Sequence, residues 1–172
     1  MKKITSHKEA TAEILNFTGD LEDSGAAFCE AMNELAAALP DAPFSSEQLE
    51  MIFGPEAIDP ETAATILTKA GHVEILPYLI RQFKEEKKTT IQLSYAAMLA
   101  QLGDEYGYQI LEEIFAKFMK SDSGFEDFDF ENFEYVFEEI LTNERGQKLR
   151  SRFRKEADYE VEWHTVEHPD FE

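Results

Sequence analysis

A motif that recurs after 32 residues constrains the fold of this chain more than any other feature. The first copy begins at Leu67 and reads LTKAGHVEILPYLI, and the second begins at Leu99 and reads LAQLGDEYGYQILEE. Gly71 of the first copy aligns with Gly103 of the second. A period of this length is typical of stacked helical hairpins. The repeat therefore predicts an all-α fold in which neighbouring hairpins share a continuous core.

Residues typical of helix ends divide the rest of the chain into predicted helices. Ser45 and Thr89 each begin a predicted capping box, and Asp59 precedes a proline that suits the first turn of a helix. Asn143 is a predicted cap for a basic helix, whereas Pro77 should leave the start of its helix bent or irregular. The predicted helices cover residues 6–18, 20–39, 45–54, 60–70, 72–87, 89–102, 104–120, 129–141 and the basic run that follows.

The two copies of the motif resemble the short HEAT-like repeats of bacterial scaffold and lyase-type proteins. In those repeats an apolar helix ends in Leu-Gly-Asp, and the next helix begins with a proline-containing Val-Pro-x-Leu-Ile. Residues 102–104 read LGD and residues 76–80 read LPYLI, which are the best matches in this chain. The resemblance covers residues 60–120, and a weaker copy around Gly19 extends it to residues 8–38.

The resemblance implies a short stack of antiparallel hairpins, with about eight or nine helices in all. The second helices of the hairpins, here residues 72–87 and 104–120, would line a concave face. We expect one repeat domain at residues 1–156, with residues 40–58 as an insertion and residues 157–172 as an extended, acidic C-terminal arm. An irregular helical bundle, in which the glycines are ordinary helix ends, is the alternative fold.

The chain carries a net charge of −20, which bounds the partners it can bind. Hydrophobic residues make up 43% of the sequence and aromatic residues 12%, which separates it from disordered acidic chains. The negative field disfavours direct binding to nucleic acid or to an anionic membrane. It favours either simple solubility or a surface that is complementary to a basic protein.

The sequence also bears on the expected compartment. No apolar run approaches the roughly 20 residues that cross a bilayer, and the N-terminus lacks the apolar segment of a signal peptide. Cys29 is the only cysteine, so no intrachain disulfide forms and a buried thiol is expected. We therefore expect a soluble, cytoplasmic protein.

The most distinctive local feature is an acidic and aromatic segment, residues 121–144, which precedes a basic run at residues 145–155. The segment is interpreted either as an amphipathic helix with phenylalanine inside or as a docking surface where carboxylates meet Lys or Arg. The basic run is expected to pair internally with the flanking acids. The candidate partner-binding carboxylates of the segment are Asp127, Asp129, Glu131, Glu134 and Glu138.

A second set of candidates lies on the helices that are expected to line the concave face. The apolar positions Ile75, Leu79, Ile110 and Ile114 should be buried between repeats. Polar and aromatic side chains of the same helices should lie on the open face, where a partner can reach them. These candidates are Glu74, Tyr78, Arg81, Glu105, Tyr108 and Glu112.

The sequence contains no catalytic motif. It has no Gly-rich phosphate loop, nucleophile elbow or paired-cysteine metal site. His164 and His168 stand close together beside several glutamates, but Pro169 argues against a helix that would bring them onto one metal ion. We therefore expect no enzyme activity, no cofactor and no metal.

These observations favour a non-catalytic, acidic protein-binding module. Its sharper form is an inhibitor or immunity-type protein that neutralises a basic partner such as a nuclease toxin. The alternative is a HEAT-like scaffold or chaperone-like adaptor that binds through its concave face, with Tyr78 and Tyr108 in contact with the partner. A lyase-type enzyme is a third hypothesis, and it requires a pocket with perturbed acids.

Overall fold

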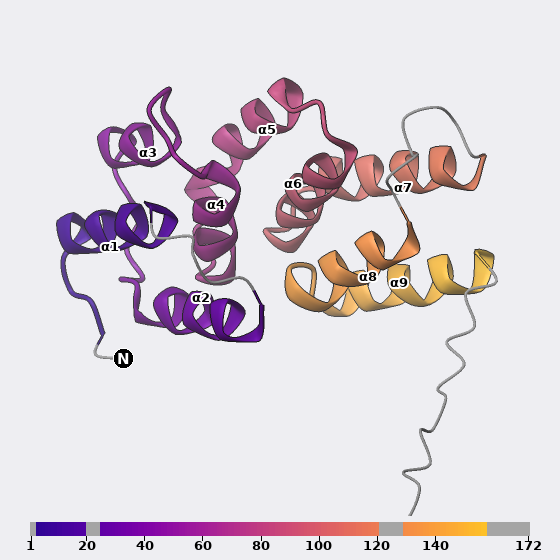
Figure 1. The fold of residues 1–172 in the computed structure, drawn as a ribbon, viewed down its shortest axis with the longest axis horizontal. Helices are drawn as coiled ribbons and strands as arrows, with labels where there is room; N and C mark the ends of the chain where they lie inside the picture. Colours follow the sequence, from indigo (N-terminus) through magenta and orange to yellow (C-terminus); the bar gives the residue numbers. More distant parts are fainter. Residues whose placement is uncertain (1–2, 20–24, 121–128, 158–172) are drawn as a thin grey trace, which may run out of the picture.

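The computed structural model describes residues 3–19, 25–120 and 129–157. These residues form nine α-helices and one 3₁₀ turn and contain no strand (Figure 1), so the predicted all-α fold is confirmed. Residues 158–172 of the predicted arm, with His164 and His168, lie outside the described residues. The elements are α1 (His7–Gly19), α2 (Ala26–Ala38), α3 (Ser46–Phe53), α4 (Pro60–Lys69), η1 (Val73–Ile75), α5 (Leu76–Glu85), α6 (Thr89–Gln101), α7 (Glu105–Met119), α8 (Phe130–Glu139) and α9 (Glu144–Glu156).

The helices pack in two layers with α6 at the centre (Figure 1). One layer contains α2, α4, α6 and α8 in that order, while α5 and α7 pack on α6 and α9 packs on α8. Every residue of α6 from Leu93 to Ala100 is buried, as expected of a helix enclosed on all sides. The predicted burial of the inter-repeat positions is confirmed for Ile75, Leu79, Ile110 and Ile114.

The two copies of the sequence motif end their helices in the same way. Gly71 and Gly103 both have left-handed backbone conformations, with φ angles of 82° and 86°. In each copy the backbone N–H of the next residue donates to a carbonyl five residues earlier, that of Leu67 at 3.0 Å and that of Leu99 at 2.9 Å. This is the Schellman pattern, in which glycine avoids the strain of a side chain. The repeat in the sequence is therefore a repeat in backbone geometry.

Most of the predicted helix starts are observed. The side chains of Ser45 and Asp59 each accept a hydrogen bond from a backbone N–H in the following first turn. Pro77 lies in the first turn of α5, and η1 precedes it, so the predicted irregular start is confirmed. The predicted capping box at Thr89 is wrong, because no side chain caps α6 and Gln92 instead donates to a backbone carbonyl of the preceding loop at 2.8 Å.

Residues 40–58, the predicted insertion, contribute side chains to the core. They contain α3, whose Leu49, Ile52 and Phe53 are buried together with Phe44. α3 packs on α1 and α4. The long interval between the first two repeat glycines therefore holds an additional helix of the stack.

The described phenylalanines of the acidic segment lie inside the protein. Phe133 and Phe137 of α8 are fully buried. Phe115 of α7 stacks on Phe153 of α9, with ring centroids 3.8 Å apart and planes 5° apart, and Phe133 meets both rings edge-on. The amphipathic interpretation of α8 is therefore confirmed, and these phenylalanines join α7, α8 and α9 instead of anchoring a partner.

Candidate functional site

Two carboxylates of the predicted docking segment are held by the basic helix α9. Glu134, whose side chain is 13% exposed, accepts hydrogen bonds from Arg150 Nε at 2.9 Å and from Arg154 Nε at 2.7 Å. Arg150 also pairs with Glu138. Burial opposes ionisation of Glu134, but the hydrogen bonds and charges of Arg154 and Arg150 outweigh it and lower the pKa of this carboxyl. Glu134 and Glu138 therefore stabilise the fold.

The other carboxylates of this segment are placed differently. Glu131 is exposed on α8 and has no ion pair among the described residues. Asp129 is exposed at the start of α8, where its backbone N–H donates to Asn132 Oδ1 at 3.0 Å. Asp127 lies outside the described residues. Of the five predicted docking carboxylates, Asp129 and Glu131 keep an exposed position without an arginine partner.

Tyr108 is only 6% exposed, so its predicted position on an open face is wrong. Its hydroxyl donates to the side chain that caps α9, and the guanidinium of Arg145 lies 3.7 Å from its ring centroid. Arg145 also donates two hydrogen bonds to Glu105, at 2.7 and 2.6 Å, and Arg152 pairs with Glu112. Because the basic helix covers this side of α7, these candidate residues hold α7 against α9.

The arginines of the chain all pair with glutamates of the described residues. This confirms the predicted internal pairing of the basic run. Because the arginines are paired, they do not form a free cationic surface, and acidic residues still outnumber basic residues. The pairs are Arg81–Glu50, Arg145–Glu105, Arg150–Glu134, Arg150–Glu138, Arg152–Glu112, Arg152–Glu156 and Arg154–Glu134.

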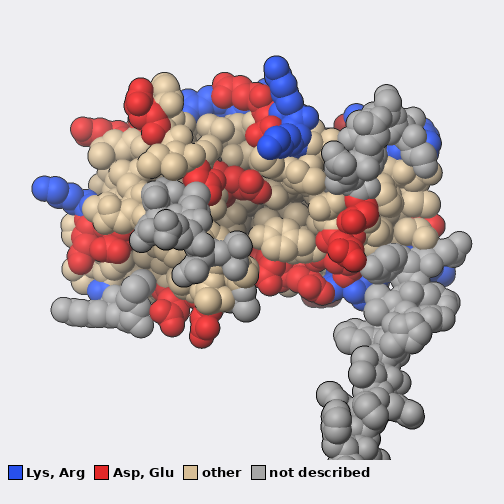
Figure 2. All heavy atoms as spheres, in the orientation of Figure 1, with Lys and Arg blue, Asp and Glu red and all other residues tan. Residues whose placement is uncertain are grey.

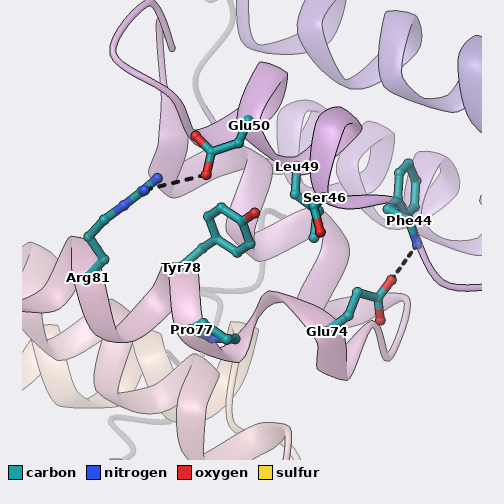
Figure 3. A pocket seen from close by; sticks show the side chains of 8 residues that line it. All are labelled: Phe44, Ser46, Leu49, Glu50, Glu74, Pro77, Tyr78 and Arg81. Atoms are coloured by element: carbon teal, nitrogen blue, oxygen red, sulfur yellow. Dashed lines mark hydrogen bonds and ion pairs between the residues drawn. The ribbon is translucent and has the colours of Figure 1, made fainter.

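Three of the predicted residues, Glu74, Tyr78 and Arg81, come together in a pocket of about 400 Å³ between α3 and α5, here called the α3–α5 pocket. Figure 3 shows Tyr78 extending from α5 toward α3, with Arg81 at one end of the pocket and Glu74 at the other. Arg81 donates to the carbonyl of Phe53 at 2.9 Å and lies 3.6 Å from Glu50. Burial, followed by the charge of Glu50, raises the pKa of Tyr78.

A second depression, here called the hollow, lies on the layer formed by α2, α4, α6 and α8. It encloses about 270 Å³ and is lined by residues from these four helices and from the end of α8. The ion pair between Lys69 Nζ and Glu139 Oε2, at 3.8 Å, joins α4 to α8 at this place. In Figure 2, acidic side chains surround a depression in the middle of this face, while Lys and Arg lie mainly toward its margins. The hollow thus lies on the first helices of the hairpins, whereas the predicted concave face was on the second helices.

Glu61, in the first turn of α4, is a partly buried carboxyl with a raised pKa. Burial raises its pKa, a hydrogen bond with Ser94 opposes this effect, and the nearby negative charges of Asp59 and Glu86 raise the pKa further. Glu61 has no basic partner among the described residues. No cation of the described residues therefore compensates its negative charge.

Tyr135 of α8 shows that helices distant in the chain face one another here. Burial raises the pKa of its hydroxyl, and so do the charges of Cys29 of α2, Glu61 of α4 and Glu139 of α8. Such effects require short distances, so side chains from three helices converge on this face. Even so, 48% of Tyr135 is exposed.

The sequence did not single out Glu61, Tyr135 or Glu139 as site residues. Glu61 follows Asp59 and a proline, and an acid at that place is ordinary in the first turn of a helix. Tyr135 and Glu139 are four residues apart on α8, which places them on one side of the helix. That spacing is the one indication in the sequence that Tyr135 and Glu139 share a surface.

Comparisons of the chain with protein-family models, with curated proteins and with solved structures find no match. Within the described ranges, no group of His, Cys, Asp and Glu is arranged to hold a metal ion. Among the described helices, none is both long enough and apolar enough to cross a membrane. The α3–α5 pocket and the hollow are therefore the candidate sites that the structure offers.

Proposed function

We propose that this chain is a non-catalytic, acidic protein-binding module that receives a basic segment of a partner protein at Glu61 and Tyr135, beside the hollow. The observation that supports the proposal is Glu61, a partly buried carboxyl with a raised pKa beside two other acids. Ionising such a group inside a protein costs free energy unless a cation lies nearby. A lysine or arginine of the partner would supply that cation.

The internal ion pairs favour the surface at Glu61 over the acidic segment as the contact surface. Glu134 and Glu138 are already occupied by arginines of α9. Glu61 has no such partner in the part of the chain that the structure describes. The net charge of −20 would attract a basic protein from a distance, and the carboxyl of Glu61 would favour docking beside the hollow.

Tyr135 adds an aromatic contact at the same place. Its ring is 48% exposed, and it lies close enough to Glu61 and Glu139 for their charges to raise the pKa of its hydroxyl. Tyrosine is frequent among the residues that dominate binding energy, and its ring face attracts Lys and Arg. The sharper form of the proposal is an inhibitor that neutralises a basic protein, such as a nuclease toxin, by covering its cationic surface.

A calorimetric titration with a lysine-rich peptide tests the proposal. Glu61→Gln and Tyr135→Ala should each weaken binding by about tenfold, because one removes a charge-assisted contact and the other an aromatic anchor. Glu9→Gln, which neutralises an exposed carboxyl of α1, is the matched control and should change the affinity little. Binding should also weaken as ionic strength rises. Equal losses in all three variants, or affinity that does not respond to salt, would count against docking at the hollow.

A HEAT-like scaffold or adaptor that binds through apolar contacts of the same face is a second proposal. It is supported by the exposure of Tyr135 and by the apolar Ala36 and Ile140 in the lining of the hollow. In that case Tyr135→Ala weakens binding, Glu61→Gln does not, and salt has little effect. A lyase-type enzyme is a third proposal, which the raised pKa of Glu61 supports and which predicts a small-molecule ligand in the hollow.

A further inference from the structure

The α3–α5 pocket contains a carboxylate that is held from one side only. Glu74 Oε1 accepts hydrogen bonds from the backbone N–H of Phe44 at 2.8 Å and from His72 Nδ1 at 2.9 Å. A carboxylate accepts and does not donate, so the proton of this second bond is on Nδ1 of the imidazole. Glu74 Oε2 has no hydrogen-bond partner among the described residues, and the side chain of Glu74 is 20% exposed. Its remaining hydrogen-bonding capacity is therefore available to a ligand.

His72 fixes the position of Glu74 without lining the pocket. The imidazole is only 3% exposed, meets the ring of Phe44 edge-on at 4.9 Å, and has a buried Nε2 without a hydrogen-bond partner in the described part of the chain. His72 therefore orients Glu74 through Nδ1 while the rest of the ring stays buried.

The remaining charges of the pocket cancel one another. Arg81 lies 3.6 Å from Glu50, and its other nitrogen donates to the carbonyl of Phe53. Its guanidinium is therefore engaged at the end of the pocket opposite Glu74 (Figure 3). The net charge that the pocket offers to a ligand is the negative charge of Glu74.

The walls of the pocket suit an aliphatic chain. The ring of Tyr78 is held in place by stacking on Phe53, with centroids 5.4 Å apart. Leu49 is 3% exposed and lies in the lining together with Pro77. The hydroxyls of Tyr78 and Ser46 also belong to the lining, and each has lone pairs that can accept a hydrogen bond.

We propose that the α3–α5 pocket binds a primary ammonium group on an aliphatic stem, carried either by a lysine side chain or by a free alkyl diamine. The ammonium donates to Glu74 Oε2 and to the hydroxyls of Ser46 and Tyr78, and the stem lies along the ring of Tyr78 and Leu49. An ammonium has three donors and no acceptor, which matches a lining of acceptors. This site is separate from the hollow and does not depend on the proposed function.

Amide NMR shifts of the isotopically labelled full chain test this proposal with two probes, cadaverine and N-acetyl-lysine methylamide. We expect the shifts to concentrate on Ser46, Tyr78 and Arg81. Glu74→Gln should weaken binding by about tenfold, because the amide keeps the shape and an acceptor for the Phe44 N–H but removes the charge. Pentanol, which has the same stem without the charge, should cause no such shifts.

The control variant is Glu47→Gln, which makes the same change at an exposed position of α3 outside the lining and should leave the affinity unchanged. If both probes bind, the proposal is supported and a lysine side chain can supply the ammonium group. If only cadaverine binds, the proposal is supported and a free diamine supplies it. Shifts located elsewhere, or an affinity that Glu74→Gln leaves intact in a folded variant, overturn it.

Thermal unfolding shows whether Glu74→Gln remains folded. If it does not, Tyr78→Phe carries the test, because it removes one hydroxyl and keeps the stacked ring. A loss of about threefold in affinity supports the proposal, and an unchanged affinity overturns it. Glu61→Gln should leave amine binding at this pocket intact, so failure here is distinguishable from failure of the proposed function.

Discussion

Glutamate occupies three different environments in this protein. Glu134 is compensated by two arginines and has a lowered pKa, whereas Glu61 is partly buried beside other acids and has a raised pKa. Glu74 is held by a backbone N–H and a buried imidazole, with one oxygen left over. The same side chain therefore stabilises the fold in one place and is available to a ligand in another, depending on which cations surround it.

Glu134→Gln should destabilise the protein by about 2 kcal/mol, because Arg150 and Arg154 lose their shared counter-ion. The melting temperature measured by circular dichroism should fall by several degrees. Glu131→Gln, one turn away and exposed without an ion pair, is the control and should change it little. Equal melting temperatures for the two variants would show that the ion pairs of Glu134 with Arg150 and Arg154 do not stabilise the fold.

The same ion pairs predict a loss of stability in acid. The lowered pKa of Glu134 means that the unfolded chain binds this proton more tightly than the folded protein does. The stability that Glu134 contributes is therefore present above its usual pKa of 4.5 and is lost as the pH falls through the lower pKa of the folded state. Denaturant unfolding at neutral pH and at pH values below 4.5 should show that the free energy of unfolding decreases in acid. In Glu134→Gln this decrease should be smaller, because the titrating carboxyl is absent. An identical pH dependence in both proteins would contradict the assignment.

The residue chemistry was only partly predictable from the sequence. The sequence did predict that the bases of residues 145–155 pair with acids. It did not show which acids, because Arg150 and Arg154 reach Glu134 only once α8 and α9 are packed. The sequence therefore places Glu134 among the docking candidates, whereas the folded chain pairs it internally. The raised pKa of Glu61 could not be predicted from the sequence either, because burial and neighbouring charges arise only in the folded chain.

At the scale of the elements, nearby residues determine where a helix begins and ends, but they do not determine which helices pack together. The predicted caps at Ser45 and Asp59 and the glycine ends at Gly71 and Gly103 depend on a few adjacent residues, and the structure bears them out. The capping box at Thr89 failed because Gln92 reaches a nearby backbone carbonyl instead. The position of α3 in the core was not evident either, since packing between distant segments decided it.

The glycines give a prediction at this scale. Gly71→Ala and Gly103→Ala should each cost about 1 kcal/mol, because both residues have a left-handed φ but open space at the Cβ position. Gly107→Ala should cost more, about 3 kcal/mol, since a Cβ there would lie 2.4 Å from Ala100 N and 2.6 Å from Ala96 O of the adjacent helix α6. Denaturant unfolding of the three variants checks the order. A smaller loss for Gly107→Ala than for the other two would mean that α6 and α7 separate easily.

At the scale of the whole molecule, the packing of the helices determines where the negative charge remains uncompensated. The arginines neutralise acids around α7, α8 and α9. The hollow contains Lys69, which pairs with Glu139, whereas Glu61 lies outside its lining, near Asp59 and Glu86 and without a basic partner among the described residues. The sequence predicted a binding face on the second helices of the hairpins, whereas the face proposed for binding is on the first helices. We propose that the charge of Glu61 is retained for binding at the expense of stability.

The most direct test measures the stability and the affinity of Glu61→Gln together. Because the pKa of Glu61 is raised, the folded protein binds this proton more tightly than the unfolded chain does. The stability linked to Glu61 is present below its usual pKa of 4.5 and is lost as the pH rises through the folded pKa, so the ionised group is unfavourable at neutral pH.

At neutral pH, Glu61→Gln should therefore raise the melting temperature while weakening the binding of a lysine-rich peptide by about tenfold. Calorimetry on the same preparation gives both quantities, and Glu9→Gln serves as the control for a simple change in net charge. A variant that melts at a lower temperature and binds the peptide as tightly as the original protein would contradict the account.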